Sequence, residues 1–302
     1  MGINAWIETH TASLKGKKIA VTGSTGGLGV ELCARLASLG ASLVLLDRNE
    51  ARSLLHKQKL EAQYGIDVCC VRLDLEDLAM AEAAVTRLLE LEIDVFFHNA
   101  GAYSIPRHAC STGYDNVYQI NFVTPYYMIR RLLPMLESRG GRVVVVGSIA
   151  HDYSKIDPSD IDFCSRKAAS RVYGNAKRYL TYSIYDCMKE HTGVAFSVVH
   201  PGITFTNITA HYPKPIFLFI KHPMKVIFMK PKKAALSLLA GLFENCGDCE
   251  WIGPRCFDVW GYPRKKPLCT ASPEEQAEIS RISHAVYEAC VQNLKNIVKK
   301  SQ

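Results

Sequence analysis

The chain has 302 residues, of which 48% are hydrophobic, and its formal net charge is +7. This supplies enough apolar material for one large core or two small ones. No stretch resembles a signal peptide, and none is both long and apolar enough to span a membrane, so we expect a cytoplasmic protein. The sequence also lacks a basic helix or an aromatic–basic module, so nucleic-acid binding is not expected.

The basic charge is concentrated in the last third of the chain. Residues 211–302 contain fourteen Lys and Arg against eight Asp and Glu, a net charge of +6. A solvated basic surface explains this excess, and attraction to anionic lipid or to an acidic substrate is the alternative interpretation.

Eleven cysteines are present, an odd number with scattered spacing. Without an export signal, they are expected to be reduced thiols. Cys246 and Cys249 form one CxxC, with Cys256 and Cys269 downstream, but no second CxxC or histidine pair completes a zinc site. We therefore expect no metal.

Six short apolar segments rich in β-branched residues alternate with amphipathic helical segments. The segments are apolar throughout, as in parallel strands covered on both faces. The expected strands are 17–23, 41–47, 68–74, 94–101, 141–148 and 194–202, and the expected helices are 28–39, 50–64, 76–91, 114–138 and 167–190. This alternation predicts a doubly wound α/β fold with a parallel sheet, and the absence of a linker or repeat predicts a single domain.

A last helix is expected from Ser272 onward, across 272–298. Ser272 would cap it, Pro273 suits its first position and Glu275 would complete a capping box. An apolar stripe follows this helix, and docking against the protein body is the main interpretation, with a contact in a homo-oligomer as the alternative. The stripe consists of Ile279, Ile282, Val286, Cys290, Leu294 and Ile297.

The segment "VTGSTGGLG" ends the first strand and opens the first helix. Glycines at such a junction let the backbone turn tightly and approach a pyrophosphate at the helix N-terminus. A glycine cluster alone is weak evidence, and its position at the first strand–helix junction strengthens it. The sequence therefore predicts a dinucleotide site here.

The spacing of Gly23, Gly27 and Gly29 resembles the TGxxxGxG motif of the short-chain dehydrogenase/reductase family. Further matches follow in order: "HNAG" (98–101) is similar to NNAG, "HPG" (200–202) ends the sixth strand, and "WIGP" (251–254) and "WGYP" (260–263) resemble the closing segment. The resemblance covers about residues 15–265 and implies a Rossmann fold. We expect a cofactor-binding core with the catalytic helix at 15–202 and a variable substrate lid at 203–250.

The same resemblance implies an NAD or NADP cofactor and the residues that hold it. Asp74 is at the position that contacts adenine, and Thr206 at the position that contacts the nicotinamide carboxamide. The expected contacts are Gly23, Ser24, Thr25, Gly27, Leu28, Gly29, Asp47, Arg48, Asp74, Leu75, Asn99, Ala100, Gly101, Tyr173, Lys177, Pro201, Gly202, Ile203 and Thr206.

A tyrosine and a lysine four residues apart occur three times: Tyr173 with Lys177, Tyr185 with Lys189, and Tyr262 with Lys266. On a helix this spacing places both side chains on one face, so the pattern alone does not choose among the pairs. The family has its catalytic tyrosine on the helix before the sixth strand, which selects the first pair by position. Tyr185 is then expected to be an ordinary helix residue and Tyr262 a loop residue.

Two further residues resemble the rest of a catalytic tetrad. Ser148 ends the fifth strand, and Asn121 lies on the preceding helix. The resemblance implies that Tyr173 exchanges a proton with the substrate oxygen, that Ser148 hydrogen-bonds this oxygen, and that Lys177 favours the phenolate and holds the nicotinamide ribose. A free tyrosine titrates near pH 10, so such help is needed.

Two adjacent residues disagree about the cofactor. Asp47 ends the second strand, where a carboxylate can bind the ribose hydroxyls and repel a 2′-phosphate, which favours NAD. Arg48 could pair with that phosphate and favour NADP. We give Asp47 more weight and expect NAD, with NADP as the alternative.

Three features depart from the commonest family pattern. His98 replaces the first Asn of NNAG, and Ala176 precedes Lys177. Ser148 and Tyr173 are 25 residues apart, which resembles the retinol-dehydrogenase-like branch and implies a lipophilic alcohol or carbonyl substrate. The additional residues 151–165 are expected to form a loop beside the pocket.

The segment 215–233 is apolar and basic, and three interpretations remain for it: a lid over an apolar substrate, interfacial membrane contact, or core packing. The expected function is an oxidoreductase acting on a steroid- or retinoid-like small molecule. The alternatives are a non-catalytic dinucleotide-binding sensor or scaffold and, less well matched in length, a sugar-nucleotide epimerase.

Overall fold

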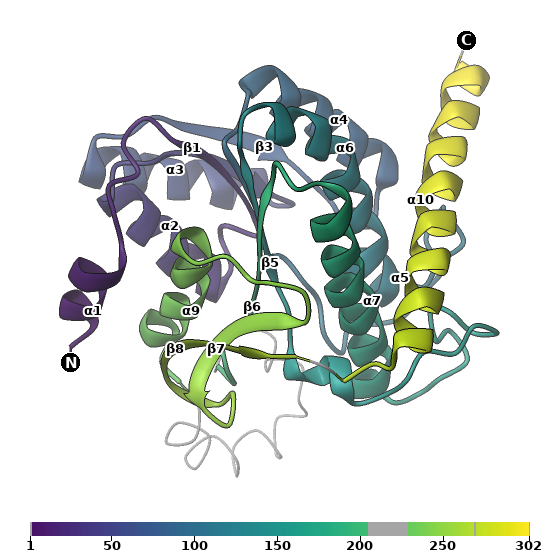
Figure 1. Ribbon diagram of the computed structural model, residues 1–302. Coiled ribbons are helices and arrows are strands. Elements are labelled where there is room, and N and C mark those ends of the chain that lie inside the picture. The colour runs from purple at the N-terminus through teal and green to yellow at the C-terminus, as the bar shows by residue number, and fades with distance from the viewer. Residues whose placement is uncertain (1, 205–228, 269, 302) are drawn as a thin grey trace, which may run out of the picture.

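A computed structural model describes residues 2–204, 229–268 and 270–301, and it has one sheet at its centre (Figure 1). The eight strands are arranged in the order β3-β2-β1-β4-β5-β6-β7-β8. All neighbouring pairs are parallel except β7 and β8, which form an antiparallel hairpin. The strands are β1 (Lys18–Thr22), β2 (Ser42–Asp47), β3 (Val68–Arg72), β4 (Val95–His98), β5 (Arg142–Val146), β6 (Ala195–Val199), β7 (Glu250–Cys256) and β8 (Trp260–Pro267).

The six strands expected from the sequence are confirmed. β1, β2, β4, β5 and β6 are almost entirely buried, as expected for parallel strands with helices on both faces. β7 and β8 were not predicted, because they contain Gly, Pro and several cations that disfavour strands in isolation. Tyr262, expected in a loop, lies in β8.

Helices cover both faces of the sheet (Figure 1). One core contains side chains of α2, α3 and α9 together with Trp6 of α1, and the other contains those of α4, α6, α7 and α10. The helices are α1 (Ile3–His10), α2 (Gly27–Ser38), α3 (Glu50–Tyr64), α4 (Leu78–Leu91), α5 (Asn116–Tyr118), α6 (Thr124–Ser138), α7 (Ala169–Glu190), α9 (Pro231–Phe243) and α10 (Pro273–Ser301). The sequence predicts these helices except α1 and α9, the second of which lies in the region expected to be a lid. The two-layer covering confirms a single doubly wound domain.

A π-helical turn, η1 (Gln119–Val123), interrupts the helix expected over 114–138. It joins α5 to α6 and contains Asn121, which is fully buried. Such turns are often found at functional sites, because they redirect one side chain within an otherwise regular helix.

Local capping explains where several helices begin and end. Asn49 and Asp77 cap α3 and α4 by accepting backbone N–H bonds, and Gly65 ends α3 in the left-handed region at φ 63°. At α10 the Ser272 hydroxyl accepts the Glu275 N–H at 3.3 Å. The second bond of the expected capping box, from the Ser272 N–H to the Glu275 carboxylate, is wrong. This carboxylate instead binds Arg178 and accepts the Ile156 N–H.

The apolar stripe of α10 docks against the protein body. Ile279, Ile282, Val286 and Cys290 are buried, and Leu294 is half-buried against the same core. Ile297 is 44% exposed, because the last turns of α10 extend past the body (Figure 1). The main interpretation of this stripe is therefore confirmed for its first four members.

Part of the expected lid region is core. Within 203–250, α9 buries Ala234 to Leu242 against β6 and α2, so these residues do not form a lid. Most of the apolar segment 215–233 lies outside the described residues. Across the part of the chain that the structure covers, no helix is long and apolar enough to cross a bilayer.

Candidate active site

The turn between β1 and α2 brings the backbone close to the space where a dinucleotide would lie. Gly23 has φ +67°, which other residues rarely adopt, and it continues β1 into the turn. A Cβ at Gly29 would lie 2.2 Å from the Gly23 carbonyl oxygen, so only glycine lets α2 pack this closely. Gly26 at the N-cap has no side chain to occupy the helix N-terminus. The first N–H groups of α2 are therefore free to receive a phosphate.

A hollow of about 360 Å³ lies along this turn at the carboxyl edge of the strands. Its lining includes residues expected from the sequence: Gly23, Thr25, Gly27, Leu28, Gly29, Asp47, Arg48, Asp74, Leu75, Asn99, Ala100 and Gly101. The structure adds Gly26, Leu46, Asn49, Arg52, Leu73, Ala102 and Ile120. The hollow and the uncapped helix together fit the adenosine and pyrophosphate of NAD(P).

The other expected cofactor contacts lie elsewhere. Ser24 is fully buried beneath the turn. Pro201, Gly202 and Ile203 follow β6 outside this hollow, and Thr206 lies outside the described residues. Their contacts with a cofactor stay predictions.

Asp47 is turned into the protein, which differs from the expectation that its carboxylate faces the ribose. Oδ1 accepts the Thr25 N–H at 3.1 Å and the Thr25 hydroxyl at 3.0 Å. Oδ2 accepts the hydroxyls of Ser24 at 2.5 Å and Ser53 at 2.9 Å. Each oxygen thus has two donors, which is about the full capacity of a carboxylate. The Asp47 carboxylate therefore has little capacity left to accept hydrogen bonds from ribose hydroxyls. The expectation of NAD depended on those bonds.

Two arginines are directed toward the adenosine end of the same hollow. The Arg48 side chain is 72% exposed, and its nearest acidic partner is Glu76 at 4.0 Å. Arg52, one turn into α3, is also exposed and has no ion pair with any described residue. The sequence pattern did not single out Arg52, because its position at the hollow depends on the direction of α3.

His98, which replaces the first asparagine of the family motif, is part of a hydrogen-bond network that connects β4 to β1. The Thr22 hydroxyl oxygen accepts the N–H groups of Asn99 and Ala100, both at 3.0 Å. Its own hydrogen then bonds Nδ1 of His98 at 3.1 Å. Burial, with a smaller effect from Lys177, holds the pKa of His98 well below its ordinary value. His98 is therefore neutral with its hydrogen on Nε2.

The four residues of the expected tetrad come together next to this hollow. The Ser148 hydroxyl lies close enough to the Tyr173 phenol to lower the pKa of that phenol. Lys177 Nζ donates to the Val146 carbonyl at 2.9 Å and lies 5.8 Å from the centre of the Tyr173 ring. Gly101 packs against Asn121 and Lys177, since a Cβ there would lie 2.8 Å from Asn121 Oδ1 and 3.7 Å from Lys177 Nζ.

Backbone contacts hold Asn121 and Ser148 in place. The Asn121 amide donates to the carbonyls of Ala102 and Val117 at 2.8 Å, and its oxygen accepts the Ala102 N–H. Ser148 caps the short helix η2 (Ile149–Asp152) by accepting the Ala150 N–H at 3.2 Å. The side chains are therefore oriented by structure that is independent of any ligand.

Burial moves the titration of the two central groups in opposite directions. It raises the pKa of Tyr173 to about 12, although the Ser148 hydroxyl opposes this. It lowers the pKa of Lys177 from 10.5 to about 8. In the ligand-free chain at neutral pH, Tyr173 is thus a protonated phenol and Lys177 is mainly an ammonium.

Aromatic and apolar side chains lie around Tyr173. The rings of Tyr103 and Tyr173 meet edge to face at 5.4 Å. Ile105 and Tyr173 both pack against the small buried cluster that contains Phe163. Tyr153, in the expected loop 151–165, is 51% exposed and close enough to act on Tyr173 electrostatically. This wall is apolar with polar edges.

The other two Tyr/Lys pairs have structural contacts. The Tyr185 hydroxyl donates to the Glu250 carbonyl at 2.8 Å, and Lys189 pairs with Asp248 at 3.0 Å. Lys266 pairs with Asp258 at 2.5 Å and donates to the Pro254 carbonyl. Both pairs stabilise the β7–β8 region, and neither is near the hollow.

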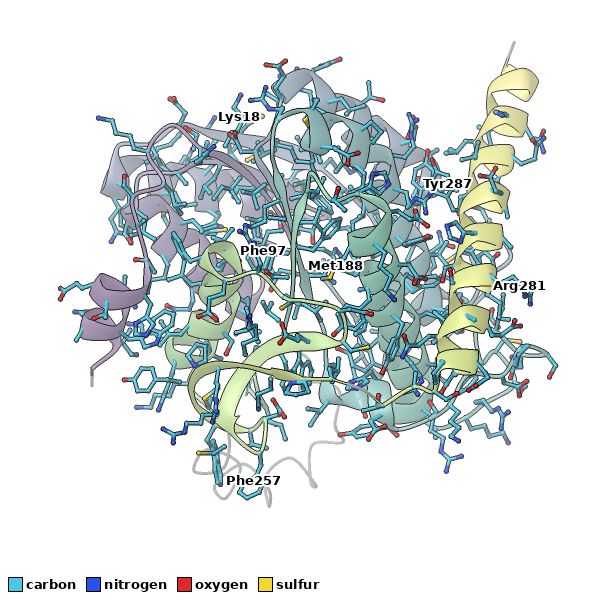
Figure 2. The ribbon with its side chains drawn as sticks, in the orientation of Figure 1. Lys18, Phe97, Met188, Phe257, Arg281 and Tyr287 are labelled. Atoms are coloured by element: carbon cyan, nitrogen blue, oxygen red, sulfur yellow. The ribbon has the colours of Figure 1, made fainter. Side chains whose placement is uncertain are left out.

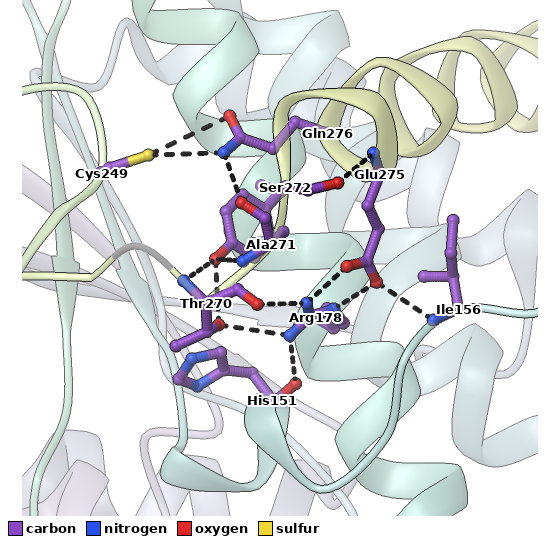
Figure 3. Close-up of polar contacts among 10 residues, drawn as sticks. His151, Ile156, Arg178, Cys249, Thr270, Ala271, Ser272, Glu275 and Gln276 are labelled. Carbon is purple, nitrogen blue, oxygen red and sulfur yellow. Dashed lines mark hydrogen bonds and ion pairs between the residues drawn. The ribbon is translucent and has the colours of Figure 1, made fainter.

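A buried ion pair behind the tetrad was missed from the sequence (Figure 3). Arg178 is 1% exposed, and it makes a bidentate pair with Glu275, with both distances 2.8 Å. Its remaining N–H groups donate to the His151 carbonyl and to the hydroxyl and carbonyl oxygens of Thr270. All five N–H groups are used, so Arg178 connects α7 and η2 to the start of α10. The two residues are 97 positions apart, so the pair becomes visible only once the packing of α10 against α7 is known.

Two groups of the described residues bring potential metal ligands within 4.8 Å of one another, namely Glu76 with His108 and Cys110, and Asp160 with Asp162 and Cys164. In the first group, Asn116 Nδ2 lies 3.2 Å from His108 Nδ1, so Nε2 carries the hydrogen that bonds Glu76. In the CxxC, Cys246 donates to the Val198 carbonyl and Cys249 contacts Gln276. Cys269 lies outside the described residues.

Comparison with known proteins identifies the family. The profile described as short chain dehydrogenase matches residues 17–215. The chain belongs to the short-chain dehydrogenase/reductase family. It is accordingly an NAD(P)-dependent oxidoreductase, and the expected family and fold are confirmed.

Individual relatives agree with this assignment. The chain is 33% identical to dehydrogenase/reductase SDR family member 13 of Bos taurus over 294 residues, which cover 88% of this chain and 77% of the relative. It is 29% identical to retinol dehydrogenase 12 of Mus musculus over 210 residues, covering 67% and 66%. A solved structure from Mycobacterium paratuberculosis has a TM-score of 0.72 at 22% identity and covers 95% of this dehydrogenase and 96% of that chain, which shows the shared fold.

Proposed function

We propose that this enzyme interconverts a lipophilic alcohol and its ketone or aldehyde, with Tyr173 as the proton-transfer residue. The observation that carries the proposal is the grouping of Tyr173 with Lys177, Ser148 and Asn121 between a dinucleotide-sized hollow and an aromatic wall. Bound NAD(P) would supply the hydride chemistry.

The chain's own residues divide the remaining work. The protonated Tyr173 donates to a carbonyl oxygen during reduction and takes the proton back during oxidation. Ser148 hydrogen-bonds the same oxygen, which fixes its position. The Lys177 ammonium stabilises the phenolate that remains after Tyr173 has donated its proton. Asn121 connects η1 to the segment at Ala102 through its amide hydrogen bonds and so holds this side of the site in place.

The substrate class is proposed from the wall around Tyr173. Tyr103 and Ile105 are half-buried and offer apolar surface, with the buried Phe163 packed behind them, and Tyr153 offers a ring with a polar edge. Such a surface favours a steroid- or retinoid-like compound over a sugar. The relatives named as retinol dehydrogenases 12 and 14 support the same class.

The cofactor is proposed to be NADP rather than the NAD expected from the sequence. Asp47 is occupied by four protein donors, while Arg48 and Arg52 are exposed at the same hollow. Two guanidinium groups match the charge and geometry of a 2′-phosphate. Arg48→Ala with Arg52→Ala should lower kcat/KM for NADP more than roughly tenfold and change that for NAD little. Higher efficiency of the wild type with NAD would refute this choice.

The experiment that tests the function measures nicotinamide absorbance with a panel of alcohols and carbonyl compounds. Tyr173→Phe should abolish turnover and keep cofactor binding, because the substitution removes only the phenol oxygen. Tyr185→Phe is the matched control on the same helix and should turn over normally. Equal loss in both variants would refute the assignment. Cofactor binding without turnover across the panel would favour the sensor or scaffold alternative.

A cytoplasmic location is part of the proposal. It is supported by the free thiols of the ten described cysteines, three of which are exposed. Fractionation of cells that produce the tagged protein tests it, and recovery in a secreted or lumenal fraction would contradict it.

A further inference from the structure

The hairpin of β7 and β8 ends in an exposed aromatic tip. Phe257 is 92% exposed, and Figure 2 shows it at the outer edge of the molecule. Phe257 and Asp258 have φ of 49° and 56°, a conformation that bulky residues rarely adopt. Trp260, at the start of β8, is 45% exposed. Two large aromatic side chains are thus presented to solvent by a tight turn.

Positive charge flanks this tip. Lys265 pairs with Glu250, and Lys266 pairs with Asp258. Arg255 and Arg264 are exposed, and neither has an ion pair with a described residue. Both line a hollow of about 590 Å³ between the hairpin and α1, together with His10. Two guanidinium groups therefore face one space beside the aromatic tip.

The tip lies at the same edge of the sheet as the active site. β7 runs parallel to β6, so its C-terminal end points in the same direction as the strand ends that carry the cofactor hollow and Ser148. His200 bonds the Asp258 carbonyl at 3.1 Å. Gly202 packs against the tip, since a Cβ there would lie 2.8 Å from the Val259 carbonyl oxygen. The tip is anchored to the segment after β6.

We propose that the β7–β8 tip docks this enzyme on an anionic lipid bilayer. Phe257 and Trp260 enter the headgroup region, and Arg255 and Arg264 bind lipid phosphates. Aromatic rings and cations together are the composition that suits this interface, and the cytoplasmic leaflet is negatively charged. The net charge of +7 is complementary to it.

The shape of the tip favours lipid over a protein partner. Among the described residues, the large exposed apolar side chains of the tip are two on a protruding turn, whereas a stable protein interface buries roughly 1,200–2,000 Å². Interfacial anchoring requires only a few inserted rings supported by charge. Docking here would direct the active-site edge toward the membrane, where a lipophilic substrate dissolves. This consequence rests on the proposed function.

Sedimentation of the full-length protein with vesicles tests the proposal. Wild-type protein should pellet with phosphatidylcholine vesicles containing about one third phosphatidylserine, and much less with phosphatidylcholine alone or at high salt. Phe257→Ser should weaken binding by roughly tenfold or more. Arg255→Gln with Arg264→Gln should abolish the preference for phosphatidylserine.

Leu54→Ser with Leu55→Ser is the matched control, because these side chains are 51% and 58% exposed on α3. It should bind vesicles like wild type. Wild-type protein that stays in the supernatant, or binding that survives both tip changes, would overturn the proposal. Binding of protein partners without vesicle binding would also overturn it.

The outcome is separable from that of the proposed function. Each tip variant should turn over a small water-soluble substrate normally in buffer without vesicles, since the tip residues are not part of the tetrad. Vesicle binding without any turnover would refute only the oxidoreductase substrate proposal. Turnover that depends on Tyr173 without vesicle binding would refute only the docking.

Discussion

Replacing Lys177 by methionine is expected to stabilise the ligand-free protein at neutral pH while abolishing turnover. The ammonium is 2% exposed, and burial lowers its pKa from 10.5 to about 8. A pKa difference of this size corresponds to about 3 kcal/mol of unfolding free energy. The Val146 carbonyl would lose its donor, which costs about 1 kcal/mol. The net gain at pH 7 is therefore about 2 kcal/mol.

The sign of the pH dependence follows from the two pKa values. Below pH 8 the folded and unfolded chains both carry the proton, so the wild type bears the full cost of the buried ammonium. Between pH 8 and 10.5 the folded chain loses this proton first, so wild-type stability rises with pH. Above this range the cost is gone. The advantage of Lys177→Met should fall to about zero near pH 10.

Equilibrium urea unfolding of both proteins at pH 7 and pH 10, without cofactor, measures this difference. Other titrating groups cancel in the comparison. Lys189→Met is the control on the same helix, because its side chain is 53% exposed, and it should change stability by less than about 0.5 kcal/mol. A Lys177→Met protein that is less stable than wild type at pH 7, or a difference that does not change with pH, would refute the reasoning.

Three further substitutions test other parts of the structure. Glu275→Gln breaks the bidentate pair with buried Arg178 and should lower the free energy of unfolding in urea by about 3 kcal/mol. Glu278→Gln, whose partner Arg281 is exposed on α10, is the control and should lower it by less than about 0.5 kcal/mol. Similar losses of stability in both variants would contradict a special role for the buried pair. Asp47→Ala leaves three hydroxyls and one N–H without their acceptor and should lower the melting temperature. Unchanged stability would show that these bonds are not formed in solution. Gly29→Ala places a Cβ 2.2 Å from the Gly23 carbonyl oxygen, so the turn must shift and cofactor binding should be abolished. Nicotinamide fluorescence measures this binding, and near-normal affinity for the cofactor would contradict the geometry of the turn.

The sequence alone predicted most of the sheet and proposed the central residues of the candidate site. Continuous apolar segments identify parallel strands that are buried on both faces, because a strand covered on both sides has no polar face to alternate with. Glycines at the first strand–helix junction identify the phosphate turn for a similarly local reason. The choice of Tyr173 over Tyr185 and Tyr262 required the family resemblance together with chain order. The structure brings Tyr173, Lys177, Ser148 and Asn121 together, and their catalytic roles stay predictions.

Tertiary structure decided what depends on partners distant in sequence. β7 and β8 are strands because they pair with β6 and with each other, although their own residues favour turns. Glu275 has the sequence position of a capping residue, yet Arg178 attracts it more strongly because a buried guanidinium needs a charged partner. Asp47 has the position of a ribose ligand, but the folding of Ser24, Thr25 and Ser53 around it supplies four donors first. Local pattern determines which backbone forms, whereas the partner of a polar side chain is set by the competition among all the groups that the fold brings within reach.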